Sequence, residues 1–217
     1  MKKSKKAVIF GSSGQAEVMA FLLEADSEYE VVAFTSTREF VSQPEIYGKP
    51  FVAFEELEKN YPPSVCDMHI AIGYNNQNQT RRKFFDLAEK KGYHLLTYIS
   101  SRATNYAKSI GKNCFIFEDN TIQPFVEIGD NCILWSGNHI GHHSVIEENC
   151  FVSSHVVISG HCRIGANSFL GVNSTLRDGV KIGKFNTLGA GCLIVKDTSD
   201  GLTFIGQKAT EYVPKKQ

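Results

Sequence analysis

Histidines gather in one short stretch of the chain. Five of the seven fall within 23 consecutive residues: His139, His142, His143, His155 and His161. A neutral imidazole readily accepts a proton near pH 7, so such a cluster favours general-base catalysis. Imidazoles also ligate metal ions, but this spacing matches no familiar metal-binding motif, and we expect no metal. Exposed positions take one or two histidines as ordinary polar residues, whereas five together indicate a site.

A repeat of six residues encodes the elements that position these histidines. Every sixth residue is aliphatic, fifteen times in succession: Ile110, Ile116, Ile122, Ile128, Leu134, Ile140, Ile146, Val152, Ile158, Ile164, Leu170, Leu176, Ile182, Leu188 and Ile194. A period of six fits neither an amphipathic helix nor a single strand. Three hexapeptides instead make one triangular coil, and successive coils pair through their backbones about 4.8 Å apart. Fifteen repeats therefore predict a β-helix of five coils.

A second position in the repeat is also restricted. Four residues after each aliphatic comes a small or medium side chain, which we predict to pack inward near a corner of the prism. Five of the six cysteines occupy this position: Cys114, Cys132, Cys150, Cys162 and Cys192. There cysteine acts as a small hydrophobe, so we expect buried thiols rather than disulfides or metal ligands. Because one coil takes eighteen residues, His143 and His161 should be stacked, with His142 beside Gly160.

The N-terminal third begins with a strand, a glycine loop and a helix. Residues 5–10 form an apolar strand, residues 11–15 (GSSGQ) the loop, and residues 16–24 a helix. Such a loop places free backbone N–H groups and a helix N-terminus where a phosphate can bind, although most glycine turns are only turns. The dinucleotide pattern GxGxxG with a later acidic residue is missing, so NAD is not expected.

Further strands and helices complete a small domain. We predict strands at residues 29–34, 67–72 and 94–99, and an amphipathic helix at residues 77–91. On that helix the charged run Arg81, Arg82 and Lys83 is expected to face solvent. A parallel sheet of this kind binds ligands at the carboxyl ends of its strands.

Composition narrows the function classes. The 217 residues contain 23 Lys and Arg and 23 Asp and Glu, so charge gives no reason to expect binding to nucleic acid or to an anionic membrane. No apolar stretch approaches the length that spans a bilayer, and the N-terminus lacks the apolar core of a signal peptide. We expect a cytoplasmic protein without membrane insertion.

Several segments together resemble a known family. They are the GSSG loop at residues 11–14, the repeats that begin Ile-Gly, and residues 141–146 (GHHSVI), 159–165 (SGHCRIG) and 169–174 (FLGVNS). In this order they resemble the bacterial sugar acetyltransferases typified by sialic-acid O-acetyltransferases and by N-acetyltransferases of nucleotide-linked 4-amino sugars. The resemblance implies a Rossmann-like nucleotide-sugar-binding domain at residues 1–103, a left-handed parallel β-helix acyltransferase domain at residues 104–198, and a tail at residues 199–217.

The same resemblance implies roles for individual residues. His142 corresponds to the general base and Gly160 to a backbone donor for the thioester oxygen, while His143 takes the place of the family's acidic partner. The nucleotide-sugar contacts correspond to Gly11, Ser13, Gly14, Gln15, Thr35, Ser36 and Gly73. The acetyl-CoA contacts correspond to Phe151, Val172 and Ala190. Two further departures are Thr35 and Ser36 in place of an acidic pair, and residues 206–210 (GQKAT) in place of Gly-x-Pro-Ala-Lys.

These implications lead to one main hypothesis and three rivals. The main hypothesis is transfer of the acetyl group of acetyl-CoA to the amino group of a nucleotide-linked amino sugar of the 4-amino-4,6-dideoxy type, in bacterial surface-glycan (lipopolysaccharide) biosynthesis. The family resemblance also implies a homotrimer with the coenzyme between neighbouring prisms. The rivals are O-acetylation of a sugar hydroxyl such as that of a sialic acid, a non-catalytic sugar-nucleotide-binding scaffold, and a γ-class carbonic anhydrase, which would need three zinc-binding histidines.

Overall fold

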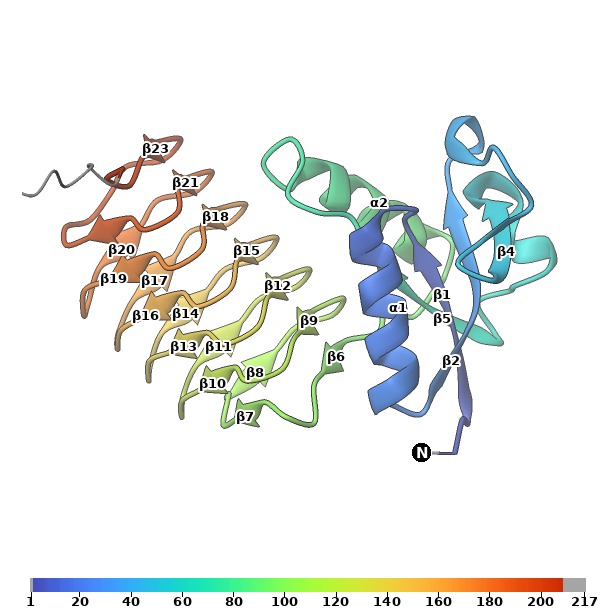
Figure 1. Ribbon diagram of the computed structural model, residues 1–217, viewed down its shortest axis with the longest axis horizontal. Coiled ribbons are helices and arrows are strands. Elements are labelled where there is room, and N and C mark those ends of the chain that lie inside the picture. Colours follow the sequence, from blue (N-terminus) through green and yellow to red (C-terminus); the bar gives the residue numbers. More distant parts are fainter. Residues whose placement is uncertain (1, 209–217) are drawn as a thin grey trace, which may run out of the picture.

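The computed structural model describes residues 2–208, which form an α/β unit beside a parallel β-helix (Figure 1). The elements of the α/β unit are β1 (Lys5–Phe10), α1 (Gly14–Asp26), β2 (Tyr29–Ser36), η1 (Arg38–Phe40), β3 (Glu45–Ile46), β4 (Lys49–Ala53), η2 (Phe54–Lys59), β5 (Cys66–Ile70) and α2 (Gln79–Lys90). The sheet order is β3-β4-β2-β1-β5, and every pair is parallel except β3 and β4.

The β-helix is a triangular prism built from strands of two residues. Face 1 contains β6 (Tyr98–Ile99), β9 (Phe115–Ile116), β12 (Ile133–Leu134), β15 (Phe151–Val152), β18 (Phe169–Leu170), β21 (Thr187–Leu188) and β23 (Thr203–Phe204). Face 2 contains β7 (Thr104–Asn105), β10 (Thr121–Ile122), β13 (His139–Ile140), β16 (Val157–Ile158), β19 (Thr175–Leu176) and β22 (Leu193–Ile194). Face 3 contains β8 (Ser109–Ile110), β11 (Glu127–Ile128), β14 (Val145–Ile146), β17 (Arg163–Ile164) and β20 (Lys181–Ile182).

The fifteen repeats form β8 to β22 of this prism as predicted, and β6, β7 and β23 extend it beyond the five predicted coils. Each of the fifteen aliphatics is the second residue of a strand, and all are buried except Ile110 in the first coil, which is half-buried. The five cysteines of the repeat are buried at the corners. Corner residues three positions after each aliphatic except the last, Ile194, adopt a positive φ, as His143 does at 59° and His161 at 57°. The predicted fold class, a Rossmann-like domain followed by a hexapeptide β-helix, is confirmed.

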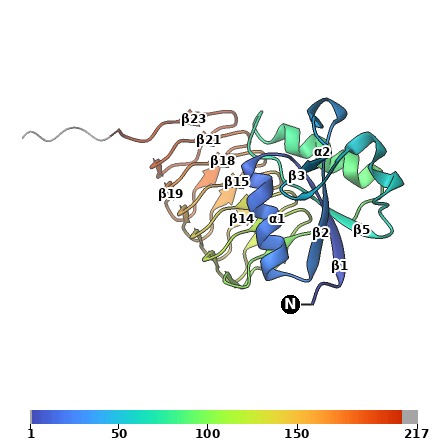
Figure 2. The ribbon, with the colours of Figure 1, turned by 45° about the vertical axis from the view of Figure 1, so that its right-hand side comes forward.

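The two units pack through an apolar interface on face 1. Helix α1 lies between the sheet and the prism in both views of the ribbon (Figures 1 and 2). Its residues Met19 and Leu23 join one buried cluster with Phe115, Phe117 and Ile133 of the β-helix. The other side of the sheet is covered by α2 and η2, which supply their own cluster. Face 1 is therefore occupied by the chain's own first domain.

Arg81 corrects the prediction of a solvated charged run on α2. Its side chain is fully buried, whereas Arg82 is half-buried and Lys83 exposed. The guanidinium donates to the carbonyl oxygens of Asn131 at 3.0 Å, Asn149 at 3.1 Å and Gly73 at 2.9 Å. Burial lowers the pKa of Arg81 to about 10, which leaves it charged at neutral pH. The prediction failed because helical periodicity does not show which polar residue meets a second domain.

The strand predicted at residues 94–99 is divided between the two units. Leu95 makes a single parallel bridge with Met68 of β5, and residues 98–99 are β6 of face 1. The apolar run is thus the connection between the domains and opens the first coil. The boundary placed between residues 103 and 104 stays a prediction. Of the predicted tail, residues 199–208 include β23, and residues 209–217 lie outside the described residues.

Candidate active site

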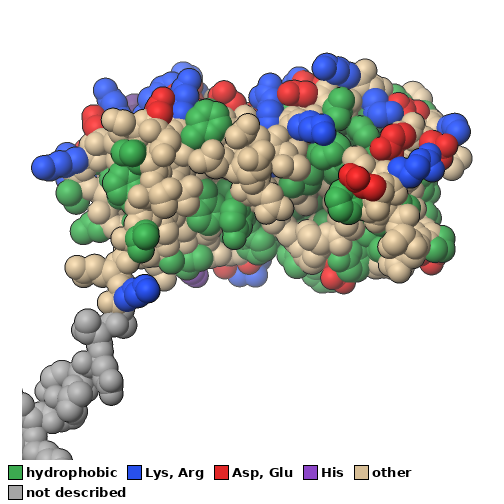
Figure 3. Space-filling view, turned by 90° about the horizontal axis from the view of Figure 1, so that it is seen from above, with side chains coloured by type: hydrophobic (Ala, Val, Ile, Leu, Met, Phe, Trp, Pro, Cys, Tyr) green, Lys and Arg blue, Asp and Glu red, His purple; other side chains and the backbone are tan. Residues whose placement is uncertain are grey.

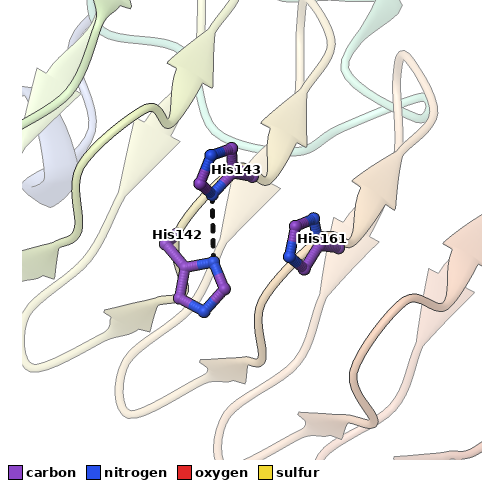
Figure 4. Close-up of side chains that lie close together, drawn as sticks. All are labelled: His142, His143 and His161. Atoms are coloured by element: carbon purple, nitrogen blue, oxygen red, sulfur yellow. Dashed lines mark hydrogen bonds between the residues drawn. The ribbon is translucent and has the colours of Figure 1, made fainter.

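The structure brings three of the five clustered histidines to one edge of the prism. His142 and His143 lie in the turn between β13 and β14, and His161 lies in the turn between β16 and β17, one coil further on. We call this line, where faces 2 and 3 meet, the histidine edge. All three side chains are exposed and close to one another (Figure 4). His139 lies on face 2 instead, and His155 lies in a turn between faces 1 and 2.

The three imidazoles have a defined mutual geometry. The Nδ1 atoms of His142 and His143 are 3.1 Å apart. The rings of His143 and His161 stack with centroids 5.0 Å apart and an interplanar angle of 14°, while the ring of His142 stands nearly perpendicular to both. Phe125, one coil earlier, continues the column with its ring centroid 4.6 Å from that of His143. The distances between these stacked rings follow the distance between coils, because equivalent corner residues are one coil apart.

Gly160 makes room for the ring of His142. A Cβ at residue 160 would lie 2.8 Å from Cε1 and 3.0 Å from Nε2 of His142, closer than such atoms pack. The same position is 2.9 Å from Oδ1 of Asp178, so the carboxylate of Asp178 approaches the same spot. The backbone N–H of His142 donates to Oε1 of Gln123 at 2.9 Å. Sequence reasoning named Gly160 but missed Gln123 and Asp178, although Asp178 lies two coil lengths after His142.

Four of the seven residues expected to contact a nucleotide sugar line one cavity of about 270 Å³ at the carboxyl ends of the strands: Gly11, Ser13, Ser36 and Gly73. Gly11 has a φ of 141°, and a Cβ there would lie 2.9 Å from the carbonyl oxygen of Ala71. Thr35 does not reach this cavity, because it is buried and its hydroxyl donates to the carbonyl oxygen of Val52 at 2.8 Å. Gly14 and Gln15 lie in the adjoining first turn of α1.

The three residues expected to contact acetyl-CoA lie in two different places. Val172 and Ala190 are exposed in successive turns between faces 1 and 2. Phe151 is only 4% exposed, and its ring packs against Tyr74 and Phe169 in the interface between the units. These assignments, like those of His142, His143 and Gly160, stay predictions.

Three further observations concern the molecule outside the predicted site. A cavity of about 740 Å³ lies between α1 and face 1, and none of the predicted site residues lines it. Basic and acidic side chains are interspersed in the space-filling view, as expected from their equal numbers (Figure 3). None of the helices in residues 2–208 has the length and apolar character needed to cross a membrane.

Comparison with known proteins identifies two modules in the chain. Residues 6–88 match the PglD N-terminal domain, and residues 108–142 and 161–196 match the bacterial transferase hexapeptide (six repeats) family. The acetyltransferase domain of PglB from Neisseria gonorrhoeae is similar over 92% of this chain and 96% of that one, with 28% identity and a TM-score of 0.82. The chain thus carries both modules and is similar to this sugar acetyltransferase over nearly its whole length.

Other solved structures agree with this assignment. PerB from Caulobacter crescentus, solved in complex with CoA and GDP-perosamine, is 25% identical over 93% of this chain and 94% of its own, with a TM-score of 0.82. WeeI from Acinetobacter baumannii is 19% identical over 94% of this chain and 97% of its own, and its TM-score of 0.80 supports the fold. No curated protein sequence matches the chain. The predicted sugar acetyltransferase family and acetyltransferase class are confirmed.

Proposed function

We propose that this acetyltransferase uses acetyl-CoA to N-acetylate a nucleotide-linked amino sugar of the 4-amino-4,6-dideoxy type, with His142 as the general base. The observation that carries the proposal is the exposed imidazole of His142 held beside Gly160 on the histidine edge. The similarity to PerB, solved with CoA and GDP-perosamine, supports this choice of donor and acceptor class. The PglB acetyltransferase domain, solved in complex with acetyl-CoA, supports the donor.

The chemistry requires a base and a donor for the developing oxyanion. As the amine nitrogen adds to the thioester carbonyl, His142 accepts its proton, a contribution of ~10²–10⁴-fold for a positioned base. The C–S bond of the tetrahedral intermediate then breaks, and the proton passes from His142 to the thiolate of CoA, which leaves as the free thiol. The backbone N–H of Gly160 lies beside His142 and is assigned to the oxyanion, a donor of a kind worth roughly 3 kcal/mol. The imidazole of His143, whose Nδ1 is 3.1 Å from that of His142, orients the base in place of a carboxylate. The repeat's cysteines are buried, so no acyl-enzyme is invoked.

The two halves of the proposed site lie on opposite sides of one chain. The nucleotide cavity belongs to the domain that covers face 1, and the histidine edge is the edge of the prism opposite face 1. An acceptor held in the cavity therefore reaches His142 of a second copy rather than that of its own chain. We propose a homotrimer of parallel prisms, with acetyl-CoA in the groove between neighbours and Val172 and Ala190 on its wall.

Face 2 supports such an assembly. Its outward residues carry no acidic or basic side chain other than His139, and Val157 and Leu193 are 39% and 67% exposed. Face 3, by contrast, carries charged outward residues, among them Glu127, Arg163 and Lys181. Face 1 is already covered by α1. Of the three faces, face 2 is therefore the one suited to contact another prism.

The proposed chemistry can be tested with purified protein. CoA release is measured with acetyl-CoA and a panel of UDP-, GDP- and dTDP-linked 4-amino sugars, each with its 4-hydroxy counterpart. We expect release with an amino sugar only. His142→Ala should lower kcat by about 10²-fold or more, because the amine then lacks its base. His94→Ala is the control, since His94 is an exposed histidine of the first domain, away from the histidine edge.

Each other result has a definite meaning. Release with the hydroxy sugars would select the rival O-acetyltransferase, which the same base and oxyanion donor can serve. Full activity of His142→Ala would refute its role as base. No release with any acceptor would favour a non-catalytic scaffold. We assign the reaction to cytoplasmic steps of bacterial surface-glycan biosynthesis, where nucleotide sugars are the building blocks.

A further inference from the structure

We infer that His142, His143 and His161 form a binding site for a divalent transition-metal ion of the zinc type, and that the bound ion switches off acetyl transfer. The ligating nitrogens of these three residues all lie within 4.8 Å of one another. They come from two successive coils, so the eighteen-residue period of the β-helix brings them together. The inhibitory part rests on the proposed role of His142 as base, whereas ion binding does not.

The geometry is close to that of a three-histidine zinc site. Zinc bonds imidazole nitrogens at about 2.0–2.1 Å, which places two nitrogens of a tetrahedral site about 3.4 Å apart. Here one pair is already 3.1 Å apart, and no pair of ligating nitrogens exceeds 4.8 Å. The rings of His143 and His161 are nearly parallel, so one must turn to face a shared ion. Both side chains are exposed and have the freedom to turn.

The surroundings favour a cation. The carboxylate of Asp178 and the ring of His142 both lie within 3.0 Å of the same point beside Gly160, which puts a negative charge next to the cluster. Within residues 2–208, His94 is the only histidine in an ion pair with a carboxylate, so the three imidazoles are not already committed to one. Imidazole nitrogen suits Zn²⁺, Ni²⁺ and Co²⁺ more than Mg²⁺ or Ca²⁺. Three protein ligands leave one position open for water.

Binding of such an ion has a direct chemical consequence. When the metal takes the lone pair of one nitrogen of His142, the other nitrogen of the neutral ring carries the proton, so neither nitrogen can accept the proton of the attacking amine. The ion also stands where the acceptor must approach the base. Occupation of the site and acetyl transfer are thus mutually exclusive, and the ion acts as an inhibitor that a chelator reverses.

Ion binding is tested first, without substrates, on protein that carries no polyhistidine tag. ZnCl₂ is titrated by calorimetry, and CoCl₂ is titrated while the visible absorption of tetrahedral cobalt is recorded. We expect one ion per chain. His161→Asn should lower the affinity by about tenfold or more, because one ligand is lost. Asparagine tolerates the positive φ at residue 161, so the fold is retained.

The matched control is His155→Asn. His155 has a φ of 58° and is exposed at the equivalent corner position, but it lies between faces 1 and 2, away from the cluster. This variant should bind zinc as the wild type does. Equal affinity of His161→Asn and wild type, or no saturable binding by the wild type, would overturn the site.

Inhibition is then measured as formation of N-acetylated product, because the thiol of released CoA itself binds zinc. Each rate is expressed relative to the same protein with EDTA. Zinc should inhibit the wild type and His155→Asn, and His161→Asn should need about tenfold more zinc for the same inhibition. Histidine-dependent binding without inhibition would uphold the site and refute His142 as base. Absence of activity with every acceptor would refute the proposed function while leaving the binding result intact.

Discussion

His142 and Gly160 show how a single residue depends on the coil next to it. The imidazole of His142 occupies the space that a Cβ at residue 160 would fill, and the N–H of His161 donates to the carbonyl oxygen of His142 at 2.9 Å. In the proposed function His142 is the base, and a base that is exposed yet held by its neighbours in the next coil would be pre-organised for proton transfer. Gly160 therefore has a steric role, beside the role of hydrogen-bond donor that we propose for it.

His69 is buried, whereas His142 is exposed, and its burial leads us to predict that the stability of the protein depends on pH. It is fully buried on β5, with its ring 5.1 Å from that of Phe115. Burial lowers the pKa of His69 to about 4. In the unfolded chain its pKa is about 6.5, so the unfolded state binds the proton first as pH falls. Protonation therefore destabilises the fold by up to about 3 kcal/mol relative to pH 7, a loss that develops as pH falls from about 6.5 to about 4.

The measurement is urea unfolding of the wild type and of His69→Leu at several values across that pH range. The free energy of unfolding of the wild type should fall more steeply with decreasing pH than that of the variant, which keeps an apolar group in the same space. Parallel curves for the two proteins would show that His69 is not the group responsible.

At the scale of elements, α2 joins the two units through a buried cation. Arg81 reaches from α2 to carbonyl oxygens in two successive coils, and Asn113, Asn131 and Asn149 form a ladder there with amide hydrogen bonds of 2.7 and 2.8 Å. Arg81 also donates to the carbonyl oxygen of Gly73, which lines the proposed nucleotide cavity. The position of this cavity relative to the prism is therefore fixed by hydrogen bonds as well as by apolar packing.

Replacement of Arg81 should show how much its hydrogen bonds between the two units stabilise the protein. Arg81→Leu leaves several buried carbonyl oxygens without donors, so we expect the free energy of unfolding to fall by about 3 kcal/mol. Arg82→Leu is the control, because Arg82 forms a surface i,i+4 pair with Asp86 and lies over the ring of Phe85, so its loss should cost less than about 1 kcal/mol. Chemical denaturation measures both values. Equal effects of the two variants would contradict the structural role of Arg81.

At the scale of the whole molecule, the histidine edge and the nucleotide cavity lie on opposite sides of one prism. If neighbouring copies complete each site, two inactive variants should complement each other. His142→Ala removes the base, and Ser13→Trp fills the cavity; the hydroxyl of Ser13 makes no capping hydrogen bond, so its loss spares α1. Random co-assembly in equal amounts should restore roughly a quarter of the sites.

The mixture is prepared by co-expression, and activity is compared with that of each variant alone. Analytical ultracentrifugation of the wild type should show a trimer. A mixture no more active than its components would refute a site shared between copies, provided that ultracentrifugation shows the variants to assemble together.

The sequence by itself determined the prism, because each hexapeptide contacts only its neighbours and its aliphatic residue has one buried position to occupy. It also placed His142, His143 and Gly160 on stacked coils, since the period fixes which residues are adjacent. The tertiary structure decided what the period does not encode: that Arg81 is buried, that Phe151 faces the first domain, and that this domain covers the face opposite the histidines. Those facts depend on how two separately folded surfaces meet, and a local pattern carries no information about its distant partner.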